Sequence, residues 1–412
     1  MDIGKGKICN ARQATAMSDP QHPIKMPGRS IRTFVWDFAD EGVHEVLERL
    51  AESGVDGVHL ALAYHGGRFY CPHNPKRTLI HAPDGVLYFQ PLLSCYEGIQ
   101  PRVHPQYGSG AFVARLRDAV HEYDMAFSAW IVLCNNITLS TAYPETNCVN
   151  ATGDRLEGAL CPSNPEVRVY AQALIEDLAH RVGVDVIEIE DFAFPPHHSY
   201  VGTIWQDAPI GPGLGYLLSL CFCEHCRRRA EEVNMEVDDL IYHAERMIRA
   251  GLTGDMTDRR ICDEIADPYT PVSRYAEVRA ETVKTLLDEL IEATEGSHVM
   301  ALQLILREQP DDAWRWGQEL HALRQRRLHA TLQTESSASA TSAFIGRYLD
   351  LLQLGHNLAA DISLSIPECE DYTPAATIEA CMEAGLERFI FSHYGLAPLD
   401  MLDWIGALVR SR

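Results

Sequence analysis

Short runs of apolar and β-branched residues recur along the chain, and segments with helical periodicity lie between them. The runs predict eight strands, over residues 32–38, 55–65, 125–133, 184–194, 298–306, 328–335, 357–366 and 388–394. Residues 43–51 and 167–182 place their apolar side chains on one helical face, and Asn164 with Pro165 suits the N-cap and first turn of the second helix. Both helices run directly into a predicted strand.

This alternation of strands and helices predicts a parallel sheet. The last four predicted strands begin about 30 residues apart, which is the length of a minimal βαβ unit. Eight such units that close on themselves form an α/β fold of the (β/α)₈ TIM-barrel type, and this is the fold that we predict. A doubly wound open sheet is the alternative, but no glycine-rich turn of the dinucleotide-binding type follows the first strand.

The spacing of the elements also predicts the domain organisation. Residues 1–30 are polar, contain three prolines and show no period, so we expect a loosely ordered leader before a single barrel domain over residues 31–412. Long insertions follow the second, third and fourth strands, over residues 66–110, 134–163 and 195–270. Because strand-to-helix loops of a barrel meet at its C-terminal face, we expect these insertions to form the walls of a pocket.

Composition narrows the class of protein. The chain has 412 residues, of which 46% are hydrophobic and 23% charged, as in ordinary folded domains. Asp and Glu number 58 against 35 Lys and Arg, a net charge of −23 that disfavours nucleic acid and anionic membranes as partners. The chain shows neither a long apolar span nor a secretion signal, which predicts a cytoplasmic protein, and its composition is compatible with a homo-oligomer.

Cysteine placement suggests a metal site. The 12 cysteines are too few for a disulfide scaffold, but Cys221, Cys223 and Cys226 form a C-x-C-x-x-C run before a predicted helix. Such a run can supply three of the four ligands of a structural zinc ion, and Cys161 is our first candidate for the fourth. Cys134, Cys148 and His225 are further candidates for that position. The alternative is that these residues are simply buried thiols that pack in the core.

The order of these motifs resembles that of a known family. Cys161-Pro162 is followed by a helix, the fourth strand and the C-x-C-x-x-C run, as in the zinc-containing β-galactosidases of glycoside hydrolase family 42, which are (β/α)₈ barrels. The resemblance is strong over residues 160–230 and otherwise lies at the level of the fold. It implies a structural zinc ion beside the pocket and carbohydrate chemistry. Residues 64–69, 220–226 and 392–395 are also similar to a group of uncharacterised glycoside-hydrolase-like barrels.

Acidic residues at the end of the fourth strand are the leading catalytic candidates. Strand alternation places Glu188 and Glu190 on one face, which we expect to be the barrel interior, and Asp191 on the other. The β-galactosidase family named above carries an Asn-Glu pair at the end of its fourth strand. This pair is missing here, so the family's catalytic roles do not transfer to these positions. Glycoside cleavage needs two carboxyl groups, and we predict Glu190 as general acid/base with Glu335 or Glu368 as the second group. An inward acid could instead pair with an arginine, and two such acids could hold a divalent cation.

Other polar and aromatic residues at the predicted strand ends are candidates for binding a sugar. In a barrel they converge on one bowl, where aromatic rings offer flat faces to the apolar side of a sugar ring. The candidates are Asp37, Tyr64, His65, Arg68, Trp130, Glu188, Asp191 and His393, whereas His59 is more typical of a core residue. We therefore predict a glycoside hydrolase, or a close relative, that acts on a small polar sugar. The alternatives are a metal-dependent sugar lyase or isomerase and a barrel that binds sugar without turnover.

Overall fold

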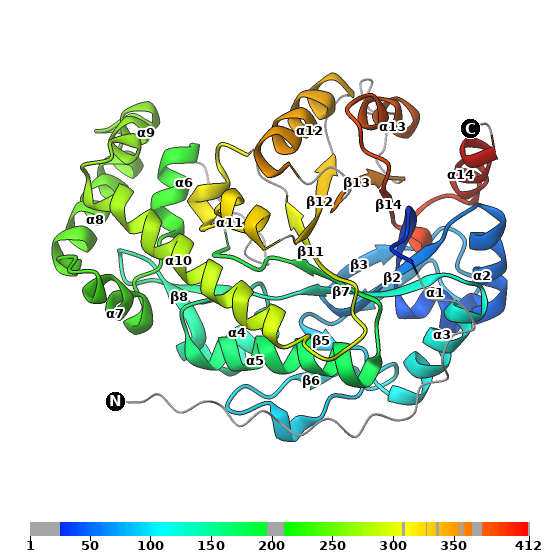
Figure 1. Cartoon of the computed structure of the whole chain (residues 1–412). Helices are drawn as coiled ribbons and strands as arrows, with labels where there is room; N and C mark the ends of the chain where they lie inside the picture. Colours follow the sequence, from blue (N-terminus) through cyan, green and yellow to red (C-terminus); the bar gives the residue numbers. More distant parts are fainter. Residues whose placement is uncertain are drawn as a thin grey trace.

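Eight parallel strands close into a barrel in the computed structural model (Figure 1). The structure describes residues 25–195, 210–306, 310–326, 328–334, 338–353, 357–364 and 373–410. The barrel strands are β1 (Arg29–Thr33), β2 (Gly57–Tyr64), β7 (Ala126–Val132), β10 (Val186–Glu190), β11 (Ala301–Leu306), β12 (His329–Thr334), β13 (Leu358–Ser363) and β14 (Phe389–Ser392). They pair in chain order, and β1 pairs with both β14 and β2, so the predicted (β/α)₈ barrel is confirmed.

The first strand differs from its prediction. The apolar run over residues 32–38 is typical of a strand, yet β1 ends at Thr33 and α1 (Val35–Glu41) begins two residues later. The carboxylate of Asp37 accepts a hydrogen bond from the backbone N–H of Phe34, at 2.8 Å, and so satisfies a donor at the start of the helix. Asp37 therefore lies in a helix and does not close the first strand.

Helices separate successive barrel strands and surround the barrel (Figure 1). They are α2 (Val43–Glu52), α3 (Gly110–Glu122), α5 (Pro165–Asp177), α10 (Pro271–Glu292), α11 (Leu320–Gln325), α12 (Ala338–Leu352), α13 (Pro374–Glu383) and α14 (Leu399–Arg410). Short 3₁₀ turns span Leu93–Cys95, Pro144–Thr146, Ala313–Trp316 and Tyr394–Leu396, and a π-helical turn spans Leu178–Val182. The side chain of Asn164 caps α5, as predicted, by accepting the backbone N–H of Glu166 at 2.8 Å. No helix within the described ranges is both long and apolar enough to cross a lipid bilayer.

The three predicted insertions carry secondary structure of their own. After β2 come β3 (Gly67–Tyr70), β4 (Leu79–Ala82), β5 (Val86–Leu87) and β6 (Arg102–Val103); after β7 come α4 (Ile137–Ala142), β8 (Asn147–Val149) and β9 (Arg155–Leu160). After β10 come α6 (Pro212–Ser219), α7 (Glu224–Glu232), α8 (Val237–Thr253) and α9 (Asp258–Ala266). These last helices pack with the start of α10 around a second apolar cluster, distinct from the main core, that includes Leu217, Leu240 and Tyr275.

A network of buried charges fills the barrel interior. The guanidinium of Arg32 on β1 donates two hydrogen bonds to Glu188 on β10, both at 3.0 Å, and one to Asp361 on β13 at 2.5 Å. His59 on β2 and Thr331 on β12 also contact the Glu188 carboxylate, at 3.1 and 2.6 Å. Burial by itself would raise the pKa of Glu188, but Arg32 and His59 hold that pKa well below its usual range. The hydrogen bonds around Arg32 and Glu188 therefore link β1, β2, β10, β12 and β13.

Replacing Arg32 should be costly. Arg32→Met keeps an aliphatic side chain of similar length but leaves the buried carboxylates of Glu188 and Asp361 without their cation, which typically costs about 3–5 kcal/mol. We expect a loss of this size in the free energy of unfolding, measured by urea denaturation. Arg29→Met, on the exposed side of the same strand, is the control and should change stability by less than about 0.5 kcal/mol. Equal effects of the two variants would contradict the central role of Arg32.

Candidate active site

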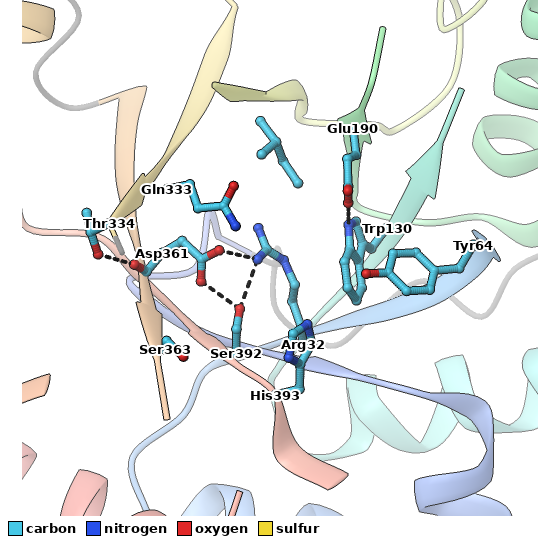
Figure 2. Close-up of a pocket in the computed structure, with 11 residues that line it drawn as sticks. Arg32, Tyr64, Trp130, Glu190, Gln333, Thr334, Asp361, Ser363, Ser392 and His393 are labelled. Carbon is cyan, nitrogen blue, oxygen red and sulfur yellow. Dashed lines mark hydrogen bonds and ion pairs between the residues drawn. The ribbon is translucent and has the colours of Figure 1, made fainter. Parts of the chain in front are cut away.

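A cavity of about 90 Å³ lies inside the barrel, at the C-terminal ends of its strands (Figure 2). The residues that line it lie on all eight barrel strands or directly follow them: Arg32, Tyr64, Trp130, Glu190, Ile305, Gln333, Thr334, Asp361, Ser363, Ser392 and His393. The lining exposes both apolar and polar atoms, and its hydroxyl, amide and carboxylate groups can bind a polar ligand. We expected the three insertions to form the pocket wall, but none of their described residues contributes to this lining.

Glu190 is held in the cavity wall by hydrogen bonds from its neighbours. The indole Nε1 of Trp130 donates to Glu190 Oε2 at 2.9 Å, and Figure 2 shows this contact at the side of the cavity. His65 Nε2 lies 3.4 Å from Glu190 Oε1. The Glu190 side chain is almost fully buried, with 3% exposed, and it lines the cavity. The prediction that Glu190 points into the barrel is confirmed.

Asp191 departs from strand alternation. Its backbone adopts a left-handed conformation, with φ of 50°, so the chain turns where β10 ends. The turn brings Asp191 Oδ2 to 3.9 Å from His65 Nε2, and Asn135 Nδ2 donates to the same oxygen at 3.1 Å. Ligand atoms of His65, Glu190 and Asp191 all lie within 4.8 Å of one another. The prediction that Asp191 faces away from Glu190 is therefore wrong.

Aromatic rings form one wall of the cavity. The ring of Tyr64 lies 4.1 Å from that of Trp130, centroid to centroid, and His393 stacks on Trp130 at 5.3 Å. Phe34 lies behind them and stacks with His393 at 5.6 Å. Burial and the charge of Arg32 together lower the pKa of His393 to about 4, so this imidazole is neutral at physiological pH. Tyr64, Trp130 and His393 therefore lie where the sequence predicts sugar-binding groups.

Besides His65 and Asp191, three further predicted binding residues lie outside the cavity lining. Glu188 forms a buried ion pair with Arg32, which confirms the alternative prediction that an inward acid pairs with an arginine. Arg68 is exposed on β3, in the hairpin with β4. Asp37 is buried in the first turn of α1, where burial and the nearby charge of Glu41 raise its pKa to about 8. None of these three lines the described cavity.

The second catalytic carboxylate predicted from the sequence cannot be located. Glu335 and Glu368 both lie outside the described residues, and so does much of residues 195–220. The structure instead brings Asp361 into the cavity opposite Glu190 (Figure 2). Alternation along the predicted strand 357–366 could have identified Asp361, because it shares an inward face with Ala359 and Ser363.

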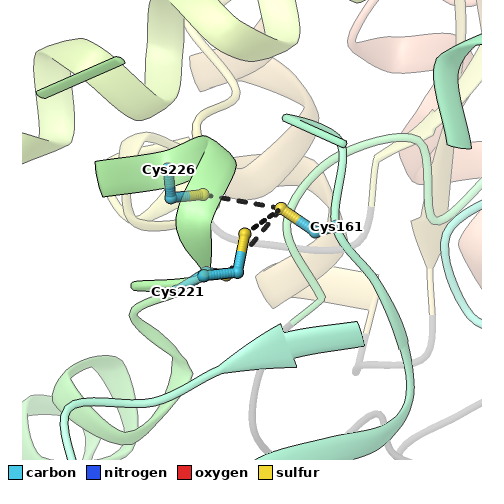
Figure 3. A group of neighbouring side chains, drawn as sticks. Cys161, Cys221 and Cys226 are labelled. Atoms are coloured by element: carbon cyan, nitrogen blue, oxygen red, sulfur yellow. Dashed lines mark hydrogen bonds between the residues drawn. The ribbon is translucent and has the colours of Figure 1, made fainter. Parts of the chain in front are cut away.

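The four predicted metal ligands lie close together, and Figure 3 shows Cys161, Cys221 and Cys226 among them. Cys161 follows β9, Cys221 and Cys223 precede α7, and Cys226 is in its first turn. The Sγ atom of Cys161 lies 3.7, 3.6 and 3.5 Å from those of Cys221, Cys223 and Cys226. A tetrahedral zinc ion with Zn–S bonds of about 2.3 Å requires sulfur–sulfur distances of about 3.8 Å. All four side chains are buried, and the cluster has the spacing of a closed metal site.

Comparison with known proteins supports the fold. No family model and no curated protein matches the chain. Among solved structures, the PgaB (BpsB) glycoside hydrolase domain from Bordetella bronchiseptica aligns over 92% of this chain and 97% of its own, with a TM-score of 0.56 and 12% identity. A cold-adapted β-galactosidase from Rahnella sp. R3 aligns over 94% of this chain and 56% of its own, with a TM-score of 0.53 and 11% identity. The chain therefore shares its barrel fold with glycoside hydrolases.

The raised pKa of Asp37 predicts a dependence of stability on pH. Its pKa of about 8 in the folded state exceeds the ordinary 3.8, so its stabilising contribution is complete below pH 3.8 and is lost as pH rises through 8. Asp37→Asn keeps an oxygen that can accept the Phe34 N–H but cannot ionise. We expect the free energy of unfolding to fall between pH 5 and 8 by at least about 1 kcal/mol more in the wild type than in this variant.

Urea denaturation at the two pH values measures this difference. The neighbouring Asp40, Glu41 and His73 are unchanged in Asp37→Asn, so their titration contributes to both proteins. Asp239→Asn, at an exposed position of α8, should retain the wild-type slope. Parallel pH profiles for the wild type and Asp37→Asn would show that Asp37 does not titrate in this range.

Proposed function

We propose that this chain is a glycoside hydrolase, or a close relative, that acts on a small polar sugar bound in the central cavity. The observation that carries the proposal is a buried glutamate, Glu190, in a polar cavity at the C-terminal end of the barrel, where barrel enzymes place their active sites. Trp130 and Tyr64 add aromatic faces beside Glu190, which suit the apolar side of a sugar ring. The shared fold with glycoside hydrolases supports the proposal.

Glu190 takes the role of proton donor in this proposal. The Trp130 indole donates to Glu190 Oε2, and His65 Nε2 lies 3.4 Å from Oε1, the oxygen that we assign to carry the proton to the leaving group. The cavity has a volume of about 90 Å³, and the polar groups in its lining suit the polar end of a sugar unit. Glu335 and Glu368, predicted from the sequence as second carboxyl groups, stay predictions.

A metal-dependent lyase or isomerase is the second candidate function. It is favoured by the grouping of His65, Glu190 and Asp191, whose ligand atoms lie within 4.8 Å of one another at the ends of β2 and β10. Two carboxylates and an imidazole can bind a divalent cation, which polarises a carbonyl or hydroxyl oxygen of a sugar. Activity that is abolished by mild chelation and restored by Mn²⁺ would favour this candidate, whereas chelator-resistant hydrolysis favours the glycoside hydrolase.

We also propose that Cys161, Cys221, Cys223 and Cys226 hold a structural zinc ion. Four thiolates complete a tetrahedron and leave no position for substrate, so the ion would stabilise the fold and take no part in chemistry. It would tie the insertion after β7 to the one after β10. Tyr275 supports the same region, because its hydroxyl donates to the backbone carbonyl of Cys221 at 2.5 Å.

Zinc content provides the test of this metal site. Protein purified without added metal should contain about one equivalent of zinc, measured by elemental analysis. Cys223→Ser should lower the melting temperature by several degrees and change activity much less. Cys381→Ser, at a buried cysteine outside the cluster, controls for the loss of a thiol and should retain the zinc. Folded, reduced protein with less than about a tenth of an equivalent would leave the packing alternative in place.

Replacing Glu190 tests the proposed hydrolase. Glu190→Gln keeps the shape of the side chain and removes the proton, so hydrolysis of a glycoside with a poor leaving group should slow by about 10²–10⁴-fold. A 2,4-dinitrophenyl glycoside, whose leaving group needs little protonation, should lose much less. Initial rates of kcat/KM on both substrates measure the difference.

The control for this experiment is Glu157→Gln, at an exposed position of β9, which should match the wild type on both substrates. Equal losses on the two substrates would assign Glu190 to binding or to nucleophilic attack. Unchanged rates on both would remove Glu190 from the active site.

A further inference from the structure

Two inward carboxylates flank the Arg32 guanidinium, and they differ in how fully they are hydrogen-bonded. Glu188 accepts two hydrogen bonds from Arg32 and further contacts from His59, Thr331 and Gln303. A carboxylate offers about four lone-pair positions, so Glu188 is saturated, and it is 0% exposed. Its surroundings leave it no capacity to bind a ligand.

Asp361 has a different environment on the other side of the same guanidinium. Among the described residues, Arg32 Nη1 donates to Oδ2 at 2.5 Å and Ser392 Oγ donates to Oδ1 at 2.6 Å. Each oxygen therefore retains a lone pair, and Asp361 lines the cavity, whereas Glu188 does not. Figure 2 shows the Asp361 carboxylate and Glu190 on opposite sides of Arg32. These are the two carboxylates in the described cavity lining.

We propose that Asp361 is the nucleophile of the reaction proposed above, with Glu190 as its acid/base partner. An oxygen of Asp361 attacks the anomeric carbon and forms a glycosyl ester while the glycosidic C–O bond breaks. The departing oxygen takes the proton of Glu190. Water then attacks the same carbon and gives a proton to Glu190, and Asp361 leaves as a carboxylate, so the configuration is retained.

The hydrogen bonds around Asp361 suit this role. Arg32 and Ser392 each donate to one oxygen of its carboxylate, which holds the attacking group in one orientation in the cavity wall. Arg32 is itself fixed by Glu188, and Ser392 fixes the second oxygen, so the Asp361 carboxylate is pre-oriented before substrate binds.

Trapping the covalent intermediate on the wild-type protein tests this inference without a mutation. The full chain is incubated with 2,4-dinitrophenyl 2-deoxy-2-fluoro-β-D-galactoside and, separately, with the corresponding β-D-glucoside, then digested and analysed by mass spectrometry. We expect one fluoroglycosyl group per chain on the peptide that contains Asp361. A label on Glu335 or Glu368 would overturn the inference and identify the sequence-predicted residue instead. Hydrolysis of the parent glycosides without any label would also overturn it.

Variants provide the second measurement. Asp361→Ala should lower kcat/KM by about 10³-fold or more, and sodium azide should restore turnover of the dinitrophenyl glycoside by forming a glycosyl azide. Glu188→Ala is the matched control: it also removes a carboxylate from Arg32, but azide should not rescue it. Equal behaviour of the two variants with azide would assign Asp361 to the ion-pair network alone.

The inference rests on the proposed hydrolase function, and different experimental outcomes would contradict the inference and the function. A wild type that hydrolyses none of the dinitrophenyl glycosides contradicts the proposed function. A wild type that hydrolyses one of them, but carries the label elsewhere or retains full activity as Asp361→Ala, contradicts the inference alone.

Discussion

The ion pair of Arg32 with Glu188 and Asp361 is the contact around which the barrel interior is organised. A guanidinium in a closed barrel cannot reach bulk water, so its charge has to be matched by carboxylates from other strands. Arg32 extends from β1 to β10 and β13, and Ser392 on β14 bonds both Arg32 and Asp361. Strands far apart in sequence are thereby held at one height in the barrel.

This network also forms the floor of the cavity. Arg32 and Asp361 line it from below, and Glu190, one alternation beyond Glu188 on β10, reaches its wall. The Arg32 guanidinium lies 4.9 Å from the centre of the Trp130 ring, and the same indole donates to Glu190. The carboxylates in the cavity are thus oriented by groups that are themselves fixed in the core, which is how a scaffold pre-organises a site.

The sequence correctly predicted the features that depend on local periodicity. Its predictions were wrong where contacts between residues far apart in the chain determine the structure. Seven of the eight barrel strands lie within the apolar runs that predicted them, and the inward direction of Glu190 follows from alternation. The partner of Glu188 could not be predicted, because Arg32 lies 156 residues away. The left-handed backbone of Asp191 breaks the alternation of the strand, so its predicted direction was wrong. The predicted place of Asp37 was wrong because its hydrogen bond with the Phe34 N–H starts a helix within an apolar run.

The cysteine cluster shows where spacing alone was informative. Three of its members lie within six residues, so their proximity is a local property, and Cys161 could be added from the order of the motifs. For the acidic residues, the sequence alone was not informative, because it does not distinguish the roles of one carboxyl group from those of another. Glu188 is saturated by hydrogen bonds, Asp361 is half-saturated and faces the cavity, and Asp37 is kept protonated by burial. The chemistry available to each carboxyl group therefore depends on the number of donors that the fold places around it.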